Sequence, residues 1–185
     1  MLLRSIAAAA ALFALPFGAS AATITFDSAD ACSSHGISIQ GAYGAACEIT
    51  TFYDGQGGTQ ALLERGASSS FWVATFDYLA DWVSIDLGDY GFDADHIFLT
   101  AYDVNGAETT SEYTIGKGVF GLHTLSVEAS DITSVKFGSK GGFGGVFADN
   151  LTVYPQVSAV PVPASVLLLG SAFAGLGFMR RSKRT

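Results

Sequence analysis

The chain has 185 residues, and its charged residues are distributed unevenly along it. All 17 Asp and Glu lie between Asp27 and Asp149, a stretch with only four Lys and Arg, so its net charge is −13. Affinity for nucleic acid comes mainly from Lys and Arg that neutralise phosphates. An acidic middle without a basic patch therefore excludes nucleic acid as a partner.

Residues 1–21 have the three parts of a secretory signal peptide. Arg4 provides the positive start, Ile6–Phe17 is an apolar run, and small residues mark a cleavage site at Ala19 and Ala21. The alternative is an uncleaved membrane anchor, but a helix of about 12 residues is too short for roughly 30 Å of hydrocarbon. We therefore expect export of the mature chain into an oxidising compartment.

Residues 22–156 are expected to form one β-rich domain. Helical periodicity is poor, and only Thr59–Arg65 has a pattern compatible with a short helical turn. Short runs of β-branched and aromatic residues, separated by Gly, Asp, Asn and Ser, indicate strands instead. These runs are Thr23–Phe26, Ile37–Gln40, Glu48–Phe52, Phe71–Phe76, Trp82–Leu87, Ile97–Tyr102, Thr109–Ile115, His123–Val127, Ser134–Phe137 and Val146–Tyr154. Their spacing predicts an all-β fold, an antiparallel β-sandwich of jelly-roll type. A β-helix is the alternative, but the sequence lacks a fixed repeat.

Cys32 and Cys47 are the only cysteines, and both lie in the part expected to be exported. A disulfide between them would close a loop of about 16 residues and contribute roughly 3 kcal/mol on the chain-entropy account. A metal site made of both cysteines and His35 is the alternative, and it would need further ligands. The sequence favours the disulfide.

No segment has a catalytic signature. The histidines His35, His96 and His123 are not accompanied by a Gly-x-Ser-x-Gly nucleophile motif. The glycine-rich segment Gly141–Gly145 is not followed by Lys-Ser or Lys-Thr, so it predicts a turn and not a phosphate loop. We expect no catalytic residues.

Acidic and aromatic residues suggest two kinds of binding site. Asp86, Asp89, Asp93 and Asp95 fall within ten residues, and Asp54 begins another oxygen-rich turn, but neither segment has EF-hand spacing. A solvated acidic face is therefore expected, with a loose Ca²⁺ site as the alternative.

Exposed aromatic rings are typical of sugar-binding sites. Trp72 and Trp82 both lie in apolar strand patterns, so at least one is predicted to be in the core. Tyr90 and Phe92, in the acidic loop, are the candidates for exposure.

The segment Gly144–Tyr154 contains Phe-Ala-Asp-Asn-Leu, an aromatic-x-Asp-Asn-apolar pattern. It resembles the closing strand of carbohydrate-binding-module-like jelly rolls. In several such families this aspartate binds a structural Ca²⁺ together with residues of the first strand. The resemblance implies a Ca²⁺ ligand at Asp149, with Asp27 as its candidate partner.

Residues 157–185 have the features of a short membrane span with a cytoplasmic stop. The uncharged run Ala164–Met179 would cover about 24 Å as a helix, close to the thickness of a hydrocarbon core. A basic cluster at 180–185 then stops transfer and places the tail in the cytoplasm. The stop-transfer residues are Arg180, Arg181, Lys183 and Arg184. A buried C-terminal helix is the alternative, but cations directly beside the run argue against it.

An extended motif precedes this span: Val160, Pro161, Val162, Pro163 and Ala164. Two prolines keep it extended and prevent the helix from continuing backwards. Motif, short span and basic end together resemble the PEP-CTERM sorting signal of Gram-negative bacteria, in its VPLPA-CTERM variant, with Val162 in place of Leu. The resemblance implies recognition by an exosortase-type protease, removal of the tail, and delivery to the cell surface or an exopolysaccharide matrix.

The sequence therefore predicts a non-enzymatic, exported protein of the cell surface or extracellular matrix, anchored transiently in the inner membrane by one transmembrane helix. A carbohydrate-binding module acting on exopolysaccharide is the alternative for the middle domain. A glycoside hydrolase is a third reading, because paired carboxylates are easy to find among 17 acids.

Overall fold

The computed structural model describes residues 20–42, 47–53, 58–66, 69–89, 93–141 and 144–156, which belong to one compact unit, Ala19–Gln156. They form antiparallel strands and one short 3-10 helix, η1 (Ala29–Cys32). Within the ranges just given, no helix has the length and hydropathy that a membrane crossing requires. The predicted fold class, an all-β antiparallel sandwich of jelly-roll type, is confirmed.

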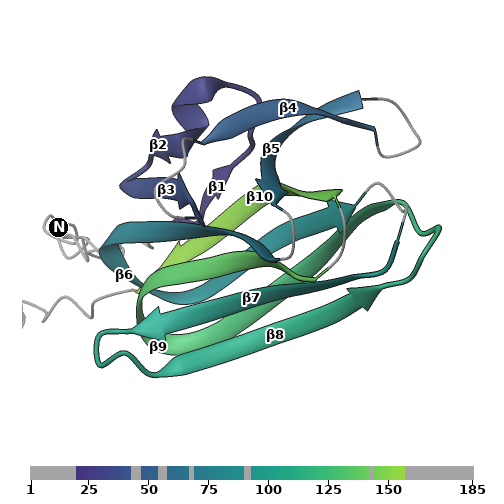
Figure 1. Cartoon of the computed structure of the whole chain (residues 1–185). Helices are drawn as coiled ribbons and strands as arrows, with labels where there is room; N and C mark the ends of the chain where they lie inside the picture. The colour runs from purple at the N-terminus through teal and green to yellow at the C-terminus, as the bar shows by residue number, and fades with distance from the viewer. Residues whose placement is uncertain are drawn as a thin grey trace, which may run out of the picture. The chain divides into compact units, whose positions relative to one another are not determined.

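The colours of Figure 1 follow the chain from β1 to β10. They are β1 (Ala22–Ile24), β2 (Ser33–Ser34), β3 (Ile37–Gly41), β4 (Glu48–Tyr53), β5 (Gly58–Gly66), β6 (Ser69–Asp89), β7 (Asp95–Asp103), β8 (Glu108–Ile115), β9 (Gly121–Lys140) and β10 (Gly144–Pro155).

Three of the expectations about individual elements need correction. The short helical turn at Thr59–Arg65 is wrong: this segment is β5, whose backbone pairs with β4 and β10. Of the predicted strands, Phe71–Phe76 and Trp82–Leu87 are one continuous strand, β6. The two predicted between His123 and Phe137 likewise belong to β9. The remaining strands match to within two residues at each end.

The strands β6 and β9 are long enough to contribute to both layers of the sandwich. The first half of β6 pairs with β3, and its second half pairs with β10. Because β9 runs antiparallel beside β6, its second half lies next to the first half of β6 and then pairs with β7. The first sheet therefore has the order β2-β3-β6-β9-β7-β8, and the second has the order β4-β5-β10-β6-β9 (Figure 1). Strand β1 pairs with the end of β10.

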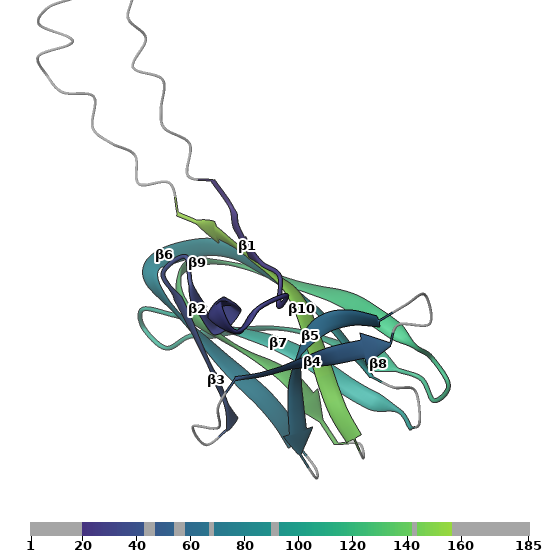
Figure 2. The ribbon, with the colours of Figure 1, turned by 90° about the horizontal axis from the view of Figure 1, so that it is seen from above.

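The long strands change sheets where their pairing becomes irregular. On β6 the register shifts between Thr75 and Ala80 and again before Trp82, and on β9 Asp131 has a φ of 58°. Extra residues of this kind bend a strand and increase its twist. The curved course of β6 and β9 is visible in Figure 2.

Alternate side chains of both sheets form the core between them. Trp72 and Phe137 from the first sheet, and Ile85 and Val153 from the second, are fully buried in one apolar cluster. Trp72 stacks on Phe137 with 5.5 Å between ring centroids. The intervening residues point to the outer face of each sheet.

The predicted disulfide between Cys32 and Cys47 is present, with 6.1 Å between the Cα atoms. Cys32 directly precedes β2 at the edge of the first sheet, and Cys47 directly precedes β4 at the edge of the second. The disulfide therefore ties the edges of the two sheets together.

Candidate functional site

Two phenylalanine rings line a cleft on the outer face of the first sheet. Gly138 on β9 pairs with Phe71 on β6 and with Phe98 on β7. Phe71 is partly exposed, whereas Phe98 is buried, with 4% of its surface exposed. Both rings line a cleft of about 370 Å³, named here the Phe71–Phe98 cleft, together with Thr100 and Tyr102.

The amino groups of two lysines lie over these rings. Nζ of Lys136 is 4.0 Å from the ring centroid of Phe71 and 5.9 Å from that of Phe98. Nζ of Lys140 is 5.2 Å from the ring centroid of Phe98. Cation–π contacts contribute about 0.5–1 kcal/mol each at exposed sites. Two of the four basic residues of the acidic domain thus lie beside one cleft.

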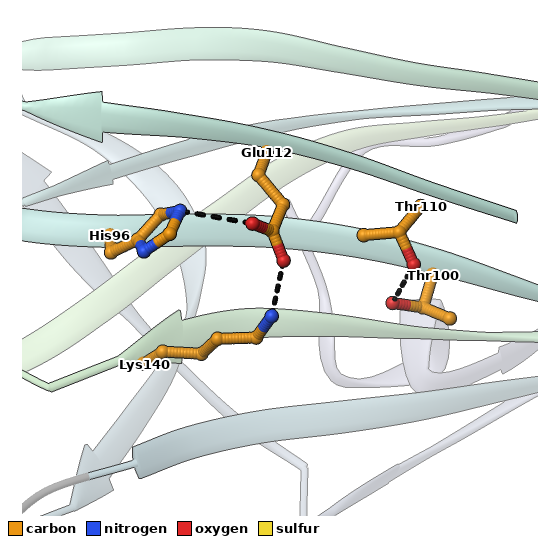
Figure 3. Close-up of polar contacts among 5 residues, drawn as sticks. All are labelled: His96, Thr100, Thr110, Glu112 and Lys140. Atoms are coloured by element: carbon orange, nitrogen blue, oxygen red, sulfur yellow. Dashed lines mark hydrogen bonds and ion pairs between the residues drawn. The ribbon is translucent and has the colours of Figure 1, made fainter.

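Glu112 on β8 contacts Lys140, one of the two cleft lysines. Its carboxylate forms ion pairs with Lys140 and with His96, whose Nε2 is 3.2 Å from Glu112 Oε2 (Figure 3). The hydrogen bond from Lys140, with the charges of Lys140 and His96, holds the pKa of Glu112 below its usual value. Beside this group, the hydroxyls of Thr100 and Thr110 lie 2.9 Å apart. Glu112 is therefore charged at neutral pH and fixes the position of Lys140.

Tyr102 on β7 and Glu108 on β8 pair across the two strands at the polar end of the cleft. Burial, with the charge of Glu108, raises the pKa of Tyr102 above its usual value of 10.0, so the phenol stays protonated and can donate a hydrogen bond. The lining thus combines ring surfaces, hydroxyl and ammonium donors, and a carboxylate acceptor. Such a lining suits a ligand with apolar faces and many hydroxyl groups.

The outer face of the second sheet has a different chemistry. Asp86 accepts a hydrogen bond from Nδ2 of Asn150 at 2.9 Å. Asp149 accepts hydrogen bonds from the backbone N–H groups of Asn150 (2.8 Å) and Phe26 (3.3 Å). Burial raises the pKa of Asp149, and the charges of Asp27 and Asp86 add to the effect. Carboxylates gather here without a lysine among these contacts.

The two predicted Ca²⁺ ligands come from segments that meet in the structure. Asp27 follows β1, and its charge acts on Asp149 at the irregular point of β10. Among the described residues, no group of three or more His, Cys, Asp and Glu is arranged to bind a metal ion. Any Ca²⁺ held by Asp27 and Asp149 would need backbone, amide or water oxygens as its other ligands.

The other acidic and aromatic candidates are dispersed. Asp95 is buried at the start of β7, whereas Asp86 belongs to the second-sheet contacts just described. Asp54, Tyr90 and Phe92 lie outside the described residues.

The prediction that at least one tryptophan is in the core is confirmed by Trp72. Trp82 is half-buried on the outer face of the second sheet, edge-to-face with Tyr154 at 5.0 Å between ring centroids.

The three histidines lie on different elements. His35 is in the turn between β2 and β3, His96 is on β7 beside Glu112, and His123 on β9 stacks against Tyr113 at 4.8 Å between ring centroids.

The sorting motif at 160–164, the span at 164–179, the basic cluster at 180–185 and Ala19 of the cleavage site lie outside the described residues. Ala21 is described, directly before β1.

The Phe71–Phe98 cleft was not among the sites predicted from the sequence. A signal for it exists, because strict alternation places Phe71 outside once Trp72 is assigned to the core. Lys136 and Lys140 are also two of four basic residues in an acidic domain, and their proximity in sequence is visible.

No protein-family profile matches the chain, and a comparison with curated proteins gives no significant match. Solved structures share its fold. The K2 cleaved adhesin domain of Lys-gingipain aligns with a TM-score of 0.51 at 15% identity, over 75% of this chain and 100% of that chain. The K1 cleaved adhesin domain, from Porphyromonas gingivalis W83, has a TM-score of 0.50 at 10% identity, over 74% of this chain and 99% of that chain. An exo-beta-agarase has a TM-score of 0.50 at 13% identity, over 73% of this chain and 25% of that chain. At these identities the likeness shows the fold alone.

Proposed function

We propose that this protein binds carbohydrate through the Phe71–Phe98 cleft, as a non-enzymatic component of the cell surface or extracellular matrix. The observation that carries the proposal is the cleft itself. Phe71, which is partly exposed, and Phe98, which is buried, line it together with lysine, tyrosine and carboxylate groups. Sugars present apolar C–H faces and polar hydroxyl edges, which such a lining can contact together.

The fold supports this reading. The aligned structures include adhesin domains and part of an exo-beta-agarase, so the same kind of sandwich occurs in proteins named for adhesion and for action on a polysaccharide. The aligned structures support only the fold. The choice of the Phe71–Phe98 cleft as the binding site rests on the residues of this chain.

We propose binding without catalysis, on the ground of two carboxyl groups, Glu112 and Asp149. A glycoside hydrolase needs a carboxyl group with a raised pKa as its general acid, close to a second carboxylate. The pKa of Glu112, which contacts the cleft residue Lys140, is lowered by that lysine, which is the opposite shift. Asp149, whose pKa is raised, lies in the second sheet and not at the cleft.

We also propose that the chain reaches the cell exterior through its two terminal segments. The signal peptide at 1–21 would direct export, and the motif at 160–164 with its span and basic tail would present the protein to an exosortase-type protease. A polysaccharide-rich exterior is where a carbohydrate-binding domain would find its ligand. This part of the proposal rests on the sequence.

Affinity electrophoresis of the purified protein in gels that contain agarose, xylan, mixed-linkage β-glucan or alginate tests the binding proposal. We expect retardation by at least one polymer, and its loss in Phe71→Ala and Lys136→Ala. Tyr154→Ala and Lys117→Ala are the matched controls, because both side chains are exposed away from the cleft. Retardation that persists in both cleft variants, or that no polymer causes, contradicts the proposal.

Mass spectrometry of the protein from its native host tests the delivery proposal. We expect a surface or matrix form that lacks residues 1–21 and the basic tail. Substitution of Pro161 and Pro163 by Ala should leave the tail attached and keep the protein in the inner membrane. Recovery of a soluble cytoplasmic form with both termini intact contradicts the proposal.

A further inference from the structure

We propose that the turn between β2 and β3 forms a second subsite for the same carbohydrate chain, centred on His35 and Asp77. This inference rests on the proposed function, and it adds that the ligand is a linear chain lying across the strands of the first sheet.

The second subsite is a pocket of about 420 Å³ at the edge of the first sheet. Four hydroxyl side chains, one imidazole and one carboxylate line it. These residues are Ser33, Ser34, Ser38, Thr75, His35 and Asp77. Hydroxyl and imidazole groups both donate and accept hydrogen bonds, and a carboxylate can accept two, so the pocket matches a ligand rich in hydroxyl groups.

The turn holds these groups in a defined geometry. His35 and Gly36 have φ values of 54° and 73°, which is the two-residue hairpin turn with both central residues left-handed. Asp77 donates its backbone N–H to the carbonyl of Gly36 at 2.9 Å. Its carboxylate packs on Gly36 so closely that any Cβ at this position would collide with it. The glycine therefore permits the approach of Asp77 to the turn.

The disulfide supports the same turn. Cys32 is the residue directly before β2, and its bond to Cys47 anchors the start of the hairpin to the second sheet. A hairpin of two-residue strands has few backbone pairs of its own, only Ser33 with Ser38 and Ser34 with Ile37. The covalent anchor thus stabilises the side of the pocket that hydrogen bonds alone hold weakly.

A continuous cross-strand row connects this pocket to the Phe71–Phe98 cleft. Each member is the pairing partner of the next, on six successive strands of the first sheet. The row is Ser33, Ser38, Thr75, Ser134, Tyr102 and Glu108. Its first three members line the pocket, and its last two line the cleft.

The length and chemistry of the row define the class of ligand. Strands lie about 4.8 Å apart, so five successive spacings give roughly 24 Å. That length accommodates several consecutive sugar units, and five of the six side chains bear hydroxyl groups. The ligand is therefore an internal stretch of a linear polysaccharide that crosses the strands, with its ring faces at the Phe71–Phe98 cleft and its hydroxyl edges at His35 and Asp77.

Isothermal titration calorimetry with disaccharides and hexasaccharides of agarose, xylan, mixed-linkage β-glucan and alginate tests this inference. Two variants remove the subsite. His35→Gly suits the left-handed backbone, and Asp77→Asn keeps the shape of the side chain. Asp30→Asn, at an exposed position of η1, is the control for loss of a negative charge.

We expect each variant to weaken binding of the hexasaccharide about tenfold, the equivalent of about one hydrogen bond, and to leave binding of the disaccharide within about twofold. The control should bind both like wild type. Unchanged hexasaccharide affinity in both variants, with binding still abolished by Phe71→Ala, overturns this inference and leaves the proposed function standing. Equal loss for both ligand lengths also overturns it. Absence of binding to every probe overturns the proposed function and this inference together.

Discussion

The outer face of the first sheet gathers two lysines and two phenylalanine rings around one cleft, whereas the outer face of the second sheet gathers aspartates around β10. The same strands, β6 and β9, contribute to both faces. The backbone therefore provides two comparable surfaces, and the side chains that alternate outward give each its own chemistry.

Two carboxyl groups show this difference most directly. The pKa of Glu112 is lowered because it accepts a hydrogen bond from Lys140 beside the charge of His96. The pKa of Asp149 is raised because it is partly buried and two further aspartates lie near it. On the first face, positive neighbours stabilise the charged form of Glu112. On the second face, burial and nearby carboxylates destabilise the charged form of Asp149. A bound cation would therefore stabilise the charged carboxylate on the second face, whereas cationic side chains already do so on the first face.

The largest expected effect on stability comes from substitution of Trp72. Comparison with Trp82 tests whether one tryptophan lies on an inner face and the other on an outer face. Trp72→Ala removes a fully buried ring that stacks on Phe137, so we expect a loss of about 3–5 kcal/mol in the free energy of unfolding. Trp82→Ala removes a half-buried ring on the outer face and its contact with Tyr154, so we expect about 1 kcal/mol. Urea denaturation of both variants measures the difference. Equal losses would mean that the assignment of inner and outer faces is wrong.

The next largest loss of stability is expected from removal of the disulfide that ties the two sheets together. Cys32→Ala with Cys47→Ala should lower the free energy of unfolding by about 3 kcal/mol, because the unfolded chain loses a closed loop. Hydrogen exchange should accelerate most in β2 and β3, at the edge of the first sheet, and least in β10, which is paired on both sides. Uniform acceleration across both sheets would show that the bond does not support the first-sheet edge in particular.

The buried tryptophan and the disulfide could both be predicted from the sequence. Alternation around Trp72 and the two isolated cysteines are local signals, and both gave correct expectations. The continuity of β6 was missed because Asp77 and Asp81 interrupt the apolar pattern at the bend. A bend that carries one strand between two sheets looks, in sequence, like a turn between two strands.

The assembly of the cleft and of the cross-strand row from separate strands could not be predicted from the sequence, for a different reason. Phe71, Phe98 and Gly138 meet only because β9 pairs with both β6 and β7 in one particular register. A shift of one residue would turn each side chain to the other face. Partner order and register depend on long-range pairing, which a single sequence does not display. Thr59–Arg65 failed similarly, because its pairing with β4 and β10 outweighs its local preference.

A smaller effect on the melting temperature is expected from substitution of Asp149, on the outer face of the second sheet. A cation should affect this face and not the first. A raised folded pKa means that the group favours the folded state when protonated, and that this contribution is lost as the pH rises through the folded pKa. Asp149→Asn is uncharged throughout and keeps an oxygen for the N–H groups of Phe26 and Asn150. With EDTA at neutral pH, its melting temperature should therefore equal or exceed that of wild type.

Millimolar Ca²⁺ separates the two proteins further. If the resemblance to Ca²⁺-binding jelly rolls extends to this site, Ca²⁺ raises the melting temperature of wild type and not that of Asp149→Asn. Asp30→Asn, on η1, should respond like wild type. A wild-type melting curve that is identical in Ca²⁺ and EDTA contradicts the predicted Ca²⁺ site.

The smallest effect concerns Glu112, whose shift has the opposite sign. A lowered folded pKa contributes stability above the unfolded value, near 4.5, and this stability is lost as the pH falls through the folded pKa. Relative to Glu112→Gln, wild type should therefore melt at a slightly higher temperature at pH 7, and the difference should vanish on acidification below the folded pKa. Glu108→Gln is the control, since it lies on the same strand and face without the contacts to Lys140 and His96. High salt should shrink the difference for Glu112→Gln, because the ion pairs are exposed and screened. A difference that persists unchanged at low pH and in high salt would show that Glu112 acts through packing, and the contrast between the two faces would then not be electrostatic at this position.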